Sequence, residues 1–263
     1  MTVPPASGLC ATAVSRRYPG DIVALDSVSL RIAAGERVAV VGESGSGKTT
    51  VLRILLALES PDSGSVTLDG RPVTPGSARS TRWFRRQVQF VPQDPGASLD
   101  PRRTVLDSVA APLQWLRLDG DHRARAREAL DAVRIPSALV GARVEDVSGG
   151  QRQRVALARA IAGRPRFLLA DEPVSGLDLG VREVVVSLLD SLCTDTGMSL
   201  VMVTHDLTVA ARTGDRIVVV HDGRIVEDGP SSRVLGAPRH PRTRSLLDAV
   251  PRLERSDLLE TRS

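Results

Sequence analysis

The chain has 263 residues, of which 41% are hydrophobic and 25% are charged. These values are typical of a globular protein with a sizeable core and exclude a chain disordered throughout. No run approaches the roughly 18 apolar residues of a membrane-spanning helix. The two cysteines are too few for a disulfide framework or a cysteine metal site. The net charge of +4 comes with dispersed arginines, so it supports nucleic-acid binding only weakly.

The first predicted elements are a strand at residues 36–41, a glycine-rich loop and a helix. The loop, Gly42-Glu43-Ser44-Gly45-Ser46-Gly47-Lys48-Thr49, fits the pattern G-x-x-x-x-G-K-[ST] in full. Glycines let backbone N–H groups and the helix N-terminus face phosphates, and the Thr49 hydroxyl is placed to bind Mg²⁺. Lys48 is the single lysine among 35 basic residues, and its compact charge on a flexible stem suits a site with strict steric and geometric requirements. The sequence therefore predicts a cradle for nucleotide phosphates.

The middle of the chain is predicted to be mostly helical. The signals for strands fade between residues 95 and 147. The arginine-rich stretch 121–133 predicts an exposed helix, and another helix is predicted from about Gly150 to Ala162. We interpret residues 95–162 as a helical insertion.

Two later segments, 167–170 and 199–203, are apolar runs that predict buried strands of a parallel sheet. Asp171 and Glu172 follow the first of them. Asp171 would bind Mg²⁺, and Glu172 would polarise the attacking water as a general base. Alone, such a pair is a weak signal, because many acidic pairs only mark a solvated strand end. The phosphate cradle upstream strengthens the prediction.

Two Asp-Gly pairs, Asp69-Gly70 and Asp222-Gly223, each lie between β-rich runs and predict hairpins. Elsewhere strands and helices alternate along the chain. The sequence as a whole therefore predicts an α/β fold.

Three other features are weak signals when each is taken alone. The segment Ser148-Gly149-Gly150-Gln151 most simply predicts a helix start, although the N–H groups there also favour an anion. His205 follows an apolar strand, where Thr204 and Asp206 offer it structural partners. Tyr18, the single tyrosine, is either a half-buried surface aromatic or a face on which a base stacks.

Taken together, these features resemble the nucleotide-binding subunits of ABC transporters. In that family's order the chain carries Tyr18, the phosphate cradle, Gln93 in VPQDP, Ser148 to Gln151, the carboxylate strand, Ser175-Gly176-Leu177-Asp178, and His205 in VTHD. The resemblance implies a P-loop NTPase with a RecA-like mixed sheet core, an N-terminal antiparallel β-subdomain and a helical subdomain. It also implies ATP hydrolysis with Mg²⁺.

The resemblance also implies roles for single residues. Tyr18 would stack on adenine. His205 would sense the γ-phosphate and orient Glu172 with its water. Gln93 would bind Mg²⁺ or that water from a loop that acts as a hinge between lobes.

A second anion site is implied in addition to the cradle. Ser148, Gly149, Gly150 and Gln151 would contact the ATP held by a partner subunit, so that two chains enclose two ATP molecules head to tail. Thr50 and Asp178 would complete the nucleotide site. A single chain is then expected to bind nucleotide and hydrolyse it poorly.

Two segments narrow the resemblance to the ATPases of dipeptide, oligopeptide and nickel importers. Residues 93–102 (QDPGASLDPR) resemble the run Q-[ND]-P-x-x-[SA]-L-[ND]-P-R. Residues 240–247 (HPRTRSLL) resemble the element H-P-Y-T-x-x-L-L, with Arg242 in place of the usual aromatic residue. The cysteine-containing tail of some members is absent, so no iron–sulfur cluster is implied.

The implied partners are a second ATPase subunit, identical or different, integral-membrane permeases and an extracytoplasmic substrate-binding protein. A short permease helix would dock beside the glutamine loop, which places the chain at the cytoplasmic face of the membrane. No nucleic acid is expected as a partner.

The ATP-binding domain is predicted to cover residues 8–238, with the helical subdomain at about 95–162 and a C-terminal extension at 239–263. Energising the import of peptides or nickel is the favoured function. A soluble ATPase coupled to a non-transport complex, such as one for phosphonate breakdown, shares much of the pattern. A nucleic-acid-stimulated ATPase has only the basic isoelectric point in its support.

Overall fold

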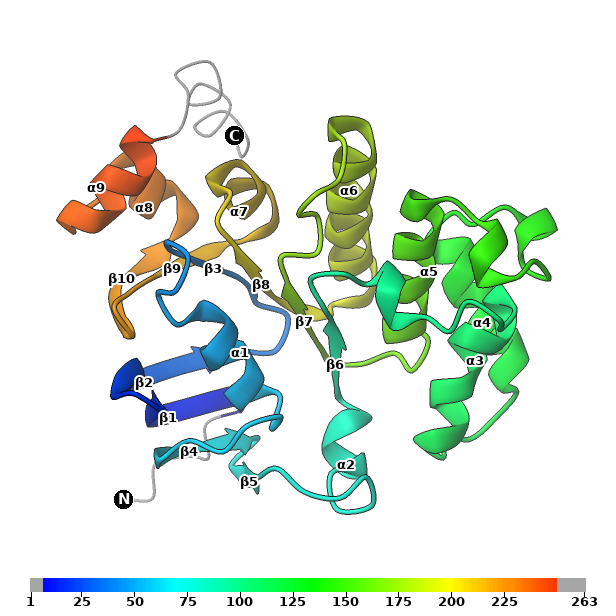
Figure 1. Ribbon diagram of the computed structural model, residues 1–263, viewed down its shortest axis with the longest axis horizontal. Coiled ribbons are helices and arrows are strands. Elements are labelled where there is room, and N and C mark those ends of the chain that lie inside the picture. The colour runs from blue at the N-terminus through cyan, green and yellow to red at the C-terminus, as the bar shows by residue number, and fades with distance from the viewer. Residues whose placement is uncertain (1–6, 250–263) are drawn as a thin grey trace. The chain divides into compact units, whose positions relative to one another are not determined.

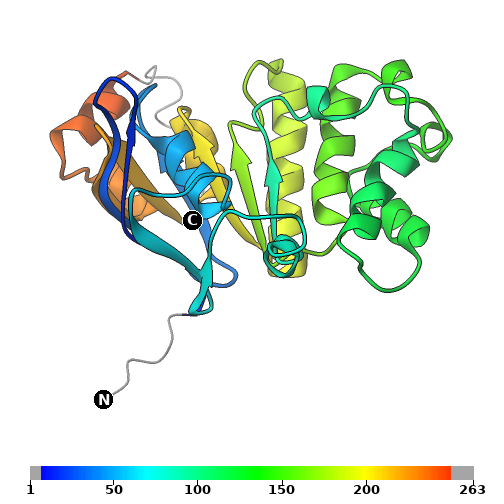
Figure 2. The same ribbon diagram turned by 60° about the horizontal axis from the view of Figure 1, so that its bottom comes forward.

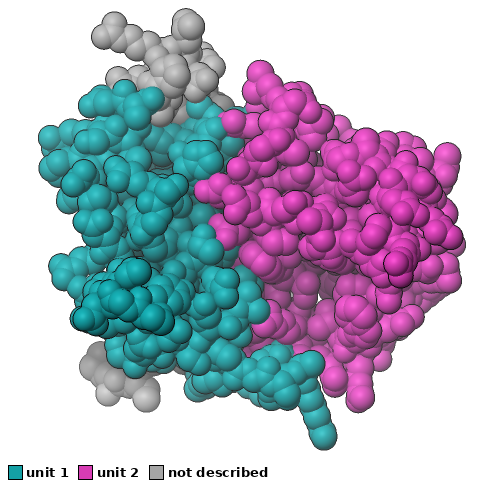
Figure 3. Space-filling model, in the orientation of Figure 1, with its two compact units in different colours: residues 1–81, 199–263 teal, residues 82–198 magenta. Residues whose placement is uncertain are grey.

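The computed structural model describes residues 7–249, which form two compact units (Figure 3). The first unit consists of the described residues up to Thr81 and from Ser199 onward, and the second of residues 82–198. Within residues 7–249, no helix has the length and apolar character needed to cross a membrane.

An antiparallel sheet in the first unit has the strand order β2-β1-β4-β5. Along β2, the buried side chains of Val28, Leu30 and Ile32 alternate with exposed polar ones, which is the pattern of a sheet with one face in solvent. This sheet confirms the expected N-terminal antiparallel β-subdomain. Its strands are β1 (Leu9–Tyr18), β2 (Ile22–Ile32), β4 (Ser63–Leu68) and β5 (Arg71–Val73).

The same unit holds a mixed sheet in which β3 lies between two parallel partners, β8 and β9, and β10 pairs antiparallel with β9. The residues of β8 are all buried, as expected for a parallel strand covered on both faces. The strands are β3 (Arg37–Val41), β8 (Ser199–Thr204), β9 (Arg216–His221) and β10 (Arg224–Pro230). The helices of this unit are α1 (Lys48–Leu55), α7 (Leu207–Thr213), α8 (Ser231–Gly236) and α9 (Pro241–Asp248).

Both predicted hairpins are confirmed, and their turns share one backbone conformation. Asp69 and Gly70 join β4 to β5 with φ angles of 50° and 77°. Asp222 and Gly223 join β9 to β10 with φ angles of 46° and 72°. Two successive positive φ angles match the right-handed twist of the paired strands, and Asp-Gly is a favoured pair for such turns.

The C-terminal part of the described chain packs against the mixed sheet. Helix α8 contacts β9 and β10 (Figure 1). Val234, Leu235 and Leu247 belong to one buried cluster with Ile217 and Val219 of β9. Residues 250–263 of the predicted extension lie outside the described residues.

The second unit contains the parallel pair β6 and β7 and several helices, of which α3, α4 and α5 lie within the predicted helical insertion 95–162. Helices α3, α4 and α5 lie side by side (Figures 1 and 2). The arginine-rich helix α4 starts after an Asp121 cap, and α5 starts at Gly149, one residue before the predicted start. The elements are α2 (Arg82–Arg85), β6 (Val88–Val91), η1 (Gly96–Ser98), α3 (Val105–Trp115), α4 (His122–Ala132), η2 (Ser137–Leu139), η3 (Val144–Asp146), α5 (Gly149–Ile161), β7 (Phe167–Asp171) and α6 (Leu179–Thr196).

Candidate functional site

The phosphate loop lies between the end of β3 at Val41 and the start of α1 at Lys48. Lys48 is only 6% exposed, and its Nζ donates to the carbonyl oxygens of Gly42 at 2.7 Å and Glu43 at 2.6 Å. The loop therefore curls around the ammonium group. Gly47 precedes the helix with a φ of 109°, a conformation that favours glycine.

Two features of the loop favour an anion. A Cβ on Gly45 would meet nothing within 4 Å, so this turn of the loop is open. The Ser46 hydroxyl is buried and has no hydrogen-bond partner among the described residues. A buried orphan hydroxyl beside backbone N–H groups at a helix N-terminus is a favourable place for an anion.

Tyr18 is half-buried at the end of β1 and is held at the N-terminal side of α1. Its hydroxyl donates to Glu59 Oε2 at 2.7 Å and lies 3.5 Å from Thr50 Oγ1. The guanidinium of Arg16 lies 5.3 Å from the ring centroid. The ring is therefore fixed next to the residues that follow the phosphate loop.

His205 is exposed directly after β8. Asp206 Oδ1 accepts from the backbone N–H of Thr208 at 2.8 Å and of Val209 at 3.2 Å, which caps α7. Thr204 Oγ1 accepts from the Asp206 N–H at 3.0 Å. Thr204 and Asp206, which were predicted to be structural partners of His205, therefore shape the turn into α7.

In the second unit, the carboxylate pair stands where β7 ends. Asp171 is 8% exposed, and Glu172 is half-buried. Glu172 has a φ of 43°, in the left-handed region that residues other than glycine seldom adopt. Strained backbone of this kind is concentrated at active sites, and here it turns the chain sharply after the strand.

The segment Ser148 to Gln151 begins α5 with a reciprocal cap. Ser148 Oγ accepts from the Gln151 N–H at 3.3 Å, and Gln151 Oε1 accepts from the Ser148 N–H at 2.8 Å. A Cβ on Gly150 would lie 3.0 Å from Val181 Cγ1, so this glycine allows α5 to approach α6 closely. Asp178 caps α6 by accepting from the Val181 N–H at 3.0 Å.

Two grooves of the second unit gather the remaining predicted residues. Gln93, Gly149 and Ser175 line one groove of about 880 Å³. Ser148, Gly150 and Asp178 line another, of about 690 Å³. The start of α5 thus opens to solvent between the glutamine loop and the loop that precedes α6.

The predicted site residues therefore fall into two sets, one in each unit. The first unit carries the phosphate loop with Tyr18, Thr50 and His205. The second unit carries Gln93, Ser148 to Gln151, Asp171, Glu172 and Asp178.

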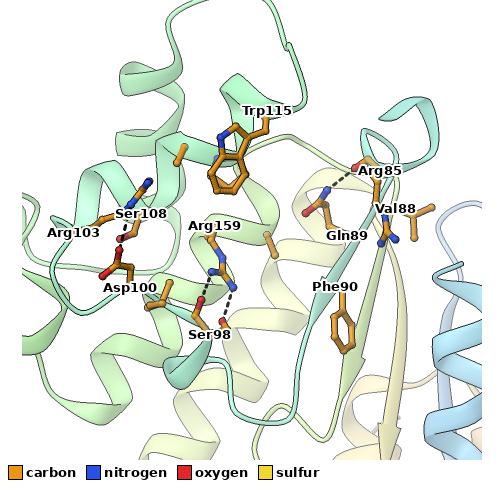
Figure 4. A pocket seen from close by; sticks show the side chains of 14 residues that line it. Arg85, Val88, Gln89, Phe90, Ser98, Asp100, Arg103, Ser108, Trp115 and Arg159 are labelled. Carbon is orange, nitrogen blue, oxygen red and sulfur yellow. Dashed lines mark hydrogen bonds and ion pairs between the residues drawn. The ribbon is translucent and has the colours of Figure 1, made fainter. Parts of the chain in front are cut away.

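Sequence reasoning missed a pocket of about 450 Å³ in the second unit (Figure 4). Arg159 lies within it and donates to the carbonyl oxygen of Ser98 at 2.8 Å and to Ser98 Oγ at 2.6 Å. Arg85 has no partner for its guanidinium among the described residues, and the buried Ser108 hydroxyl also lacks one there. Burial lowers the pKa of both Arg85 and Arg159. The indole of Trp115 is 68% exposed at the pocket.

A family model described as ABC transporter matches residues 25–175. A putative peptide import ATP-binding protein of Brucella ovis is 43% identical over 229 residues, which cover 86% of this chain and 72% of that protein. The oligopeptide transport ATP-binding protein OppD of Mycobacterium tuberculosis is 41% identical over 239 residues, which cover 90% of this chain and 39% of that protein.

Solved structures show the same likeness. The dimeric ATP-binding cassette MJ0796, in a post-hydrolysis state with ADP and Pi, matches with a TM-score of 0.76 and 34% identity, over 84% of this chain and 98% of that one. CbiO1 of Clostridium perfringens, part of the transporter complex CbiONQ, matches with a TM-score of 0.79 and 25% identity, over 94% of this chain and 97% of that one.

Proposed function

The chain belongs to the ABC transporter family as an ATP-hydrolysing subunit, and on this premise we propose that it energises the import of peptides through membrane-embedded partners. The observation that carries the proposal is the 43% identity over 229 residues to a protein named for peptide import. The 93–102 run, which resembles that of peptide and nickel importer ATPases, agrees with it. The identity to the peptide-import protein favours peptide import over nickel import and over a non-transport complex.

In this proposal the loop from Gly42 to Thr49 holds the phosphates of ATP. Lys48 leaves the carbonyl oxygens of Gly42 and Glu43 and donates to phosphate oxygens instead, because a charged acceptor makes a stronger hydrogen bond than a carbonyl. Tyr18 offers its ring to the adenine. The open space at Gly45 supports the phosphate-binding role of the loop.

The donor set fits Mg²⁺, which prefers oxygen ligands. Thr49 offers a hydroxyl, Asp171 a carboxylate and Gln93 an amide oxygen. The ion, when bound, neutralises charge on the β- and γ-phosphates.

Glu172 is the proposed general base, and it holds the attacking water by accepting its proton. His205 is proposed to orient that water and to contact the γ-phosphate. Support comes from the strained backbone of Glu172 and from the exposure of His205 directly after a buried strand.

We also propose that the start of α5 binds the ATP of a second ATPase subunit. In the cap, Ser148 Oγ accepts from the Gln151 N–H, and this leaves the single Ser148 O–H proton free to point at a phosphate oxygen. The N–H groups of Gly149 and Gly150 and the helix dipole favour the same anion. Solvent reaches this helix start through both grooves, so a partner's nucleotide has access to it.

The pocket at Arg85 is the proposed docking site for a segment of a permease. A half-buried guanidinium without a partner favours a carboxylate, and the orphan Ser108 hydroxyl favours a second polar contact. Trp115 supplies an exposed aromatic surface, a residue type enriched at interfaces. A short segment with one acidic side chain fits this chemistry.

Co-purification tests the proposal. Tagged protein, expressed in the cell that naturally makes it, is expected to bring down integral-membrane permeases. Recovery of only soluble enzymes would contradict the transporter function.

The Arg85→Glu variant should lose the permeases and keep the nucleotide affinity of the free chain. Arg127→Glu, which makes the same charge change on the exposed face of α4, serves as the matched control and should retain them. If Arg85→Glu binds the permeases as well as this control does, docking at this pocket is wrong.

A further inference from the structure

The back of the phosphate loop is held by the turn between β9 and β10. The Gly223 N–H donates to the Ser46 carbonyl oxygen at 3.0 Å. The Gly223 carbonyl in turn accepts from the Asp26 N–H of β2 at 2.9 Å. One residue of this turn therefore bridges the phosphate loop and the antiparallel sheet, although it lies more than 170 positions further along the chain than either.

The contact is too close for side chains. A Cβ on Gly42 would lie 2.2 Å from the Val220 carbonyl oxygen, and a Cβ on Gly47 would lie 2.4 Å from that of Ala24. A Cβ on Gly223 would lie 2.9 Å from the same Ala24 oxygen. Backbone packs directly on backbone on this side of the loop. A shift of the turn therefore changes the backbone contacts of the loop directly.

The hydrogen bond at Ser46 sets the direction of the next amide. A trans peptide is planar, and its C=O and N–H groups point in opposite directions. Because the Ser46 carbonyl points at the Gly223 N–H, the N–H of Gly47 in the same peptide points away from the β9–β10 turn.

The turn itself is fixed in two further ways. Arg224 donates to Asp26 Oδ2 through Nη2 at 2.5 Å and Nε at 2.9 Å, which ties the start of β10 to β2. Strand β9 pairs with β3 up to Val219 and Val41, the last residue before the loop. The turn is therefore tied to both β2 and β3, as a positioning role requires.

We propose that the β9–β10 turn, residues 221–224, positions the phosphate loop for nucleotide, with the Gly223 N–H aiming the Gly47 amide at a phosphate. The inference rests on the proposed role of residues 42–49 as the phosphate cradle. Gly223 itself does not touch nucleotide. It acts through the Ser46–Gly47 peptide, and a displaced turn leaves that peptide free to rotate.

The test compares two alanine substitutions in turns of the same kind. Gly223→Ala introduces a Cβ at 2.9 Å from the Ala24 oxygen of β2, so the turn must shift and its hydrogen bond to the Ser46 carbonyl is disturbed. Gly70→Ala is the control, because Gly70 follows Asp69 with nearly the same φ, 77° against 72°, in a turn that joins β4 to β5. Both variants carry the same left-handed strain.

Calorimetric titration of each full-length variant with ADP is the first measurement. We expect Gly223→Ala to raise the Kd for ADP about tenfold, the loss of about one hydrogen bond to a charged group, and Gly70→Ala to change it less than about twofold. Equal Kd values for the two variants at comparable melting temperatures would overturn the proposal. A wild-type chain that fails to bind ADP would instead contradict the phosphate cradle.

A second readout separates positioning from general stability. In ¹⁵N-labelled wild-type protein, ADP should shift the amide resonances of both Gly47 and Gly223, and in Gly70→Ala it should do the same. If Gly223→Ala does not fold, Arg224→Ala provides the milder displacement, and a two- to fivefold rise in Kd is expected from loosening the turn. An unchanged Kd in Arg224→Ala, together with an unshifted Gly223 amide in the wild type, would refute the proposal.

Discussion

Replacing Glu227 with glutamine tests how the C-terminal segment is anchored. Glu227 lies in β10, is 6% exposed, and accepts from the backbone N–H groups of Arg239 and His240, each at 3.0 Å. Arg233 Nη1 also donates to it at 3.2 Å. Burial acts to raise the pKa of Glu227, but the hydrogen bonds from His240, Arg239 and Thr243 and the charge of Arg233 together outweigh it, and the pKa lies below its ordinary value.

Glutamine has one acceptor oxygen and presents an NH₂ group where the second carboxylate oxygen stood. With the amide oxygen at the Oε1 position, the His240 N–H loses its acceptor, and with the oxygen at the Oε2 position, the NH₂ group faces Arg233 Nη1 as donor against donor. Hydrogen bonds to charged groups contribute about 1.5–3 kcal/mol each, so Glu227→Gln should cost about 2–3 kcal/mol of unfolding free energy. In a protein of this size that lowers Tm by about 5–10 °C.

The assay is thermal and urea unfolding, with amide hydrogen exchange at Arg239 and His240. Because the folded pKa is lowered, the stabilisation by Glu227 is complete above the unfolded pKa of about 4.3 and is lost as pH falls through the folded value. The difference in unfolding free energy between wild type and variant should therefore be constant from about pH 6 to 8 and shrink below about pH 4.5.

Glu128→Gln is the control, since it removes only an exposed ion pair with Arg164, whose side chain is 72% exposed, and should cost less than about 1 kcal/mol. Equal losses in Glu227→Gln and Glu128→Gln, or unchanged exchange at residues 239 and 240, would refute the reasoning.

Two further predictions concern the nucleotide site. Lys48→Ala and Ser148→Arg should each abolish ATP turnover, yet an equal mixture should recover up to about a quarter of wild-type turnover, because each mixed pair retains one intact site. No recovery would argue against a head-to-tail pair of identical chains. Tyr18→Ala should weaken ATP binding about tenfold by loss of base stacking, whereas Tyr18→Phe, which keeps the ring and loses only the hydroxyl contacts to Glu59 and Thr50, should weaken it about twofold or less by titration. Equal effects of both substitutions would contradict stacking.

The phosphate loop and the hairpins were predictable because their signals are local. Residues 42–49 need glycine at fixed spacings for the backbone to curl, and the Asp69-Gly70 and Asp222-Gly223 turns need two positive φ angles in succession. The cap at Ser148 is also predictable from the sequence, because S-x-x-Q at a helix start is the pattern of a capping box.

Other features depend on contacts between distant parts of the chain and have no local pattern. Glu227 binds residues 12 and 13 positions away, and nothing around it in sequence marks a buried acceptor. Arg85 lies in α2 and Ser108 in α3, and no local pattern in the sequence indicates that the two side chains line one pocket. The contact of Gly223 with Ser46 joins segments more than 170 residues apart.

The left-handed backbone of Glu172 could not be predicted either. Glutamate disfavours that conformation, and proline follows it in the sequence. Contacts within the folded unit hold the residue there, among them the hydrogen bond from the Ser175 N–H to the Glu172 carbonyl oxygen at 3.0 Å. The sequence suggested the role of Glu172 from its position after an apolar strand. The structure additionally shows that its backbone is strained.

The most direct test of the account is phosphate release from ATP by wild type and Glu172→Gln, measured with the Kd for ATP of both. If Glu172 is the general base of an ATP-hydrolysing pair, Glu172→Gln should reduce turnover about a hundredfold or more and leave the Kd within about threefold, because the amide keeps the shape of the site and cannot accept the proton. Turnover near the wild-type rate in Glu172→Gln would contradict the account.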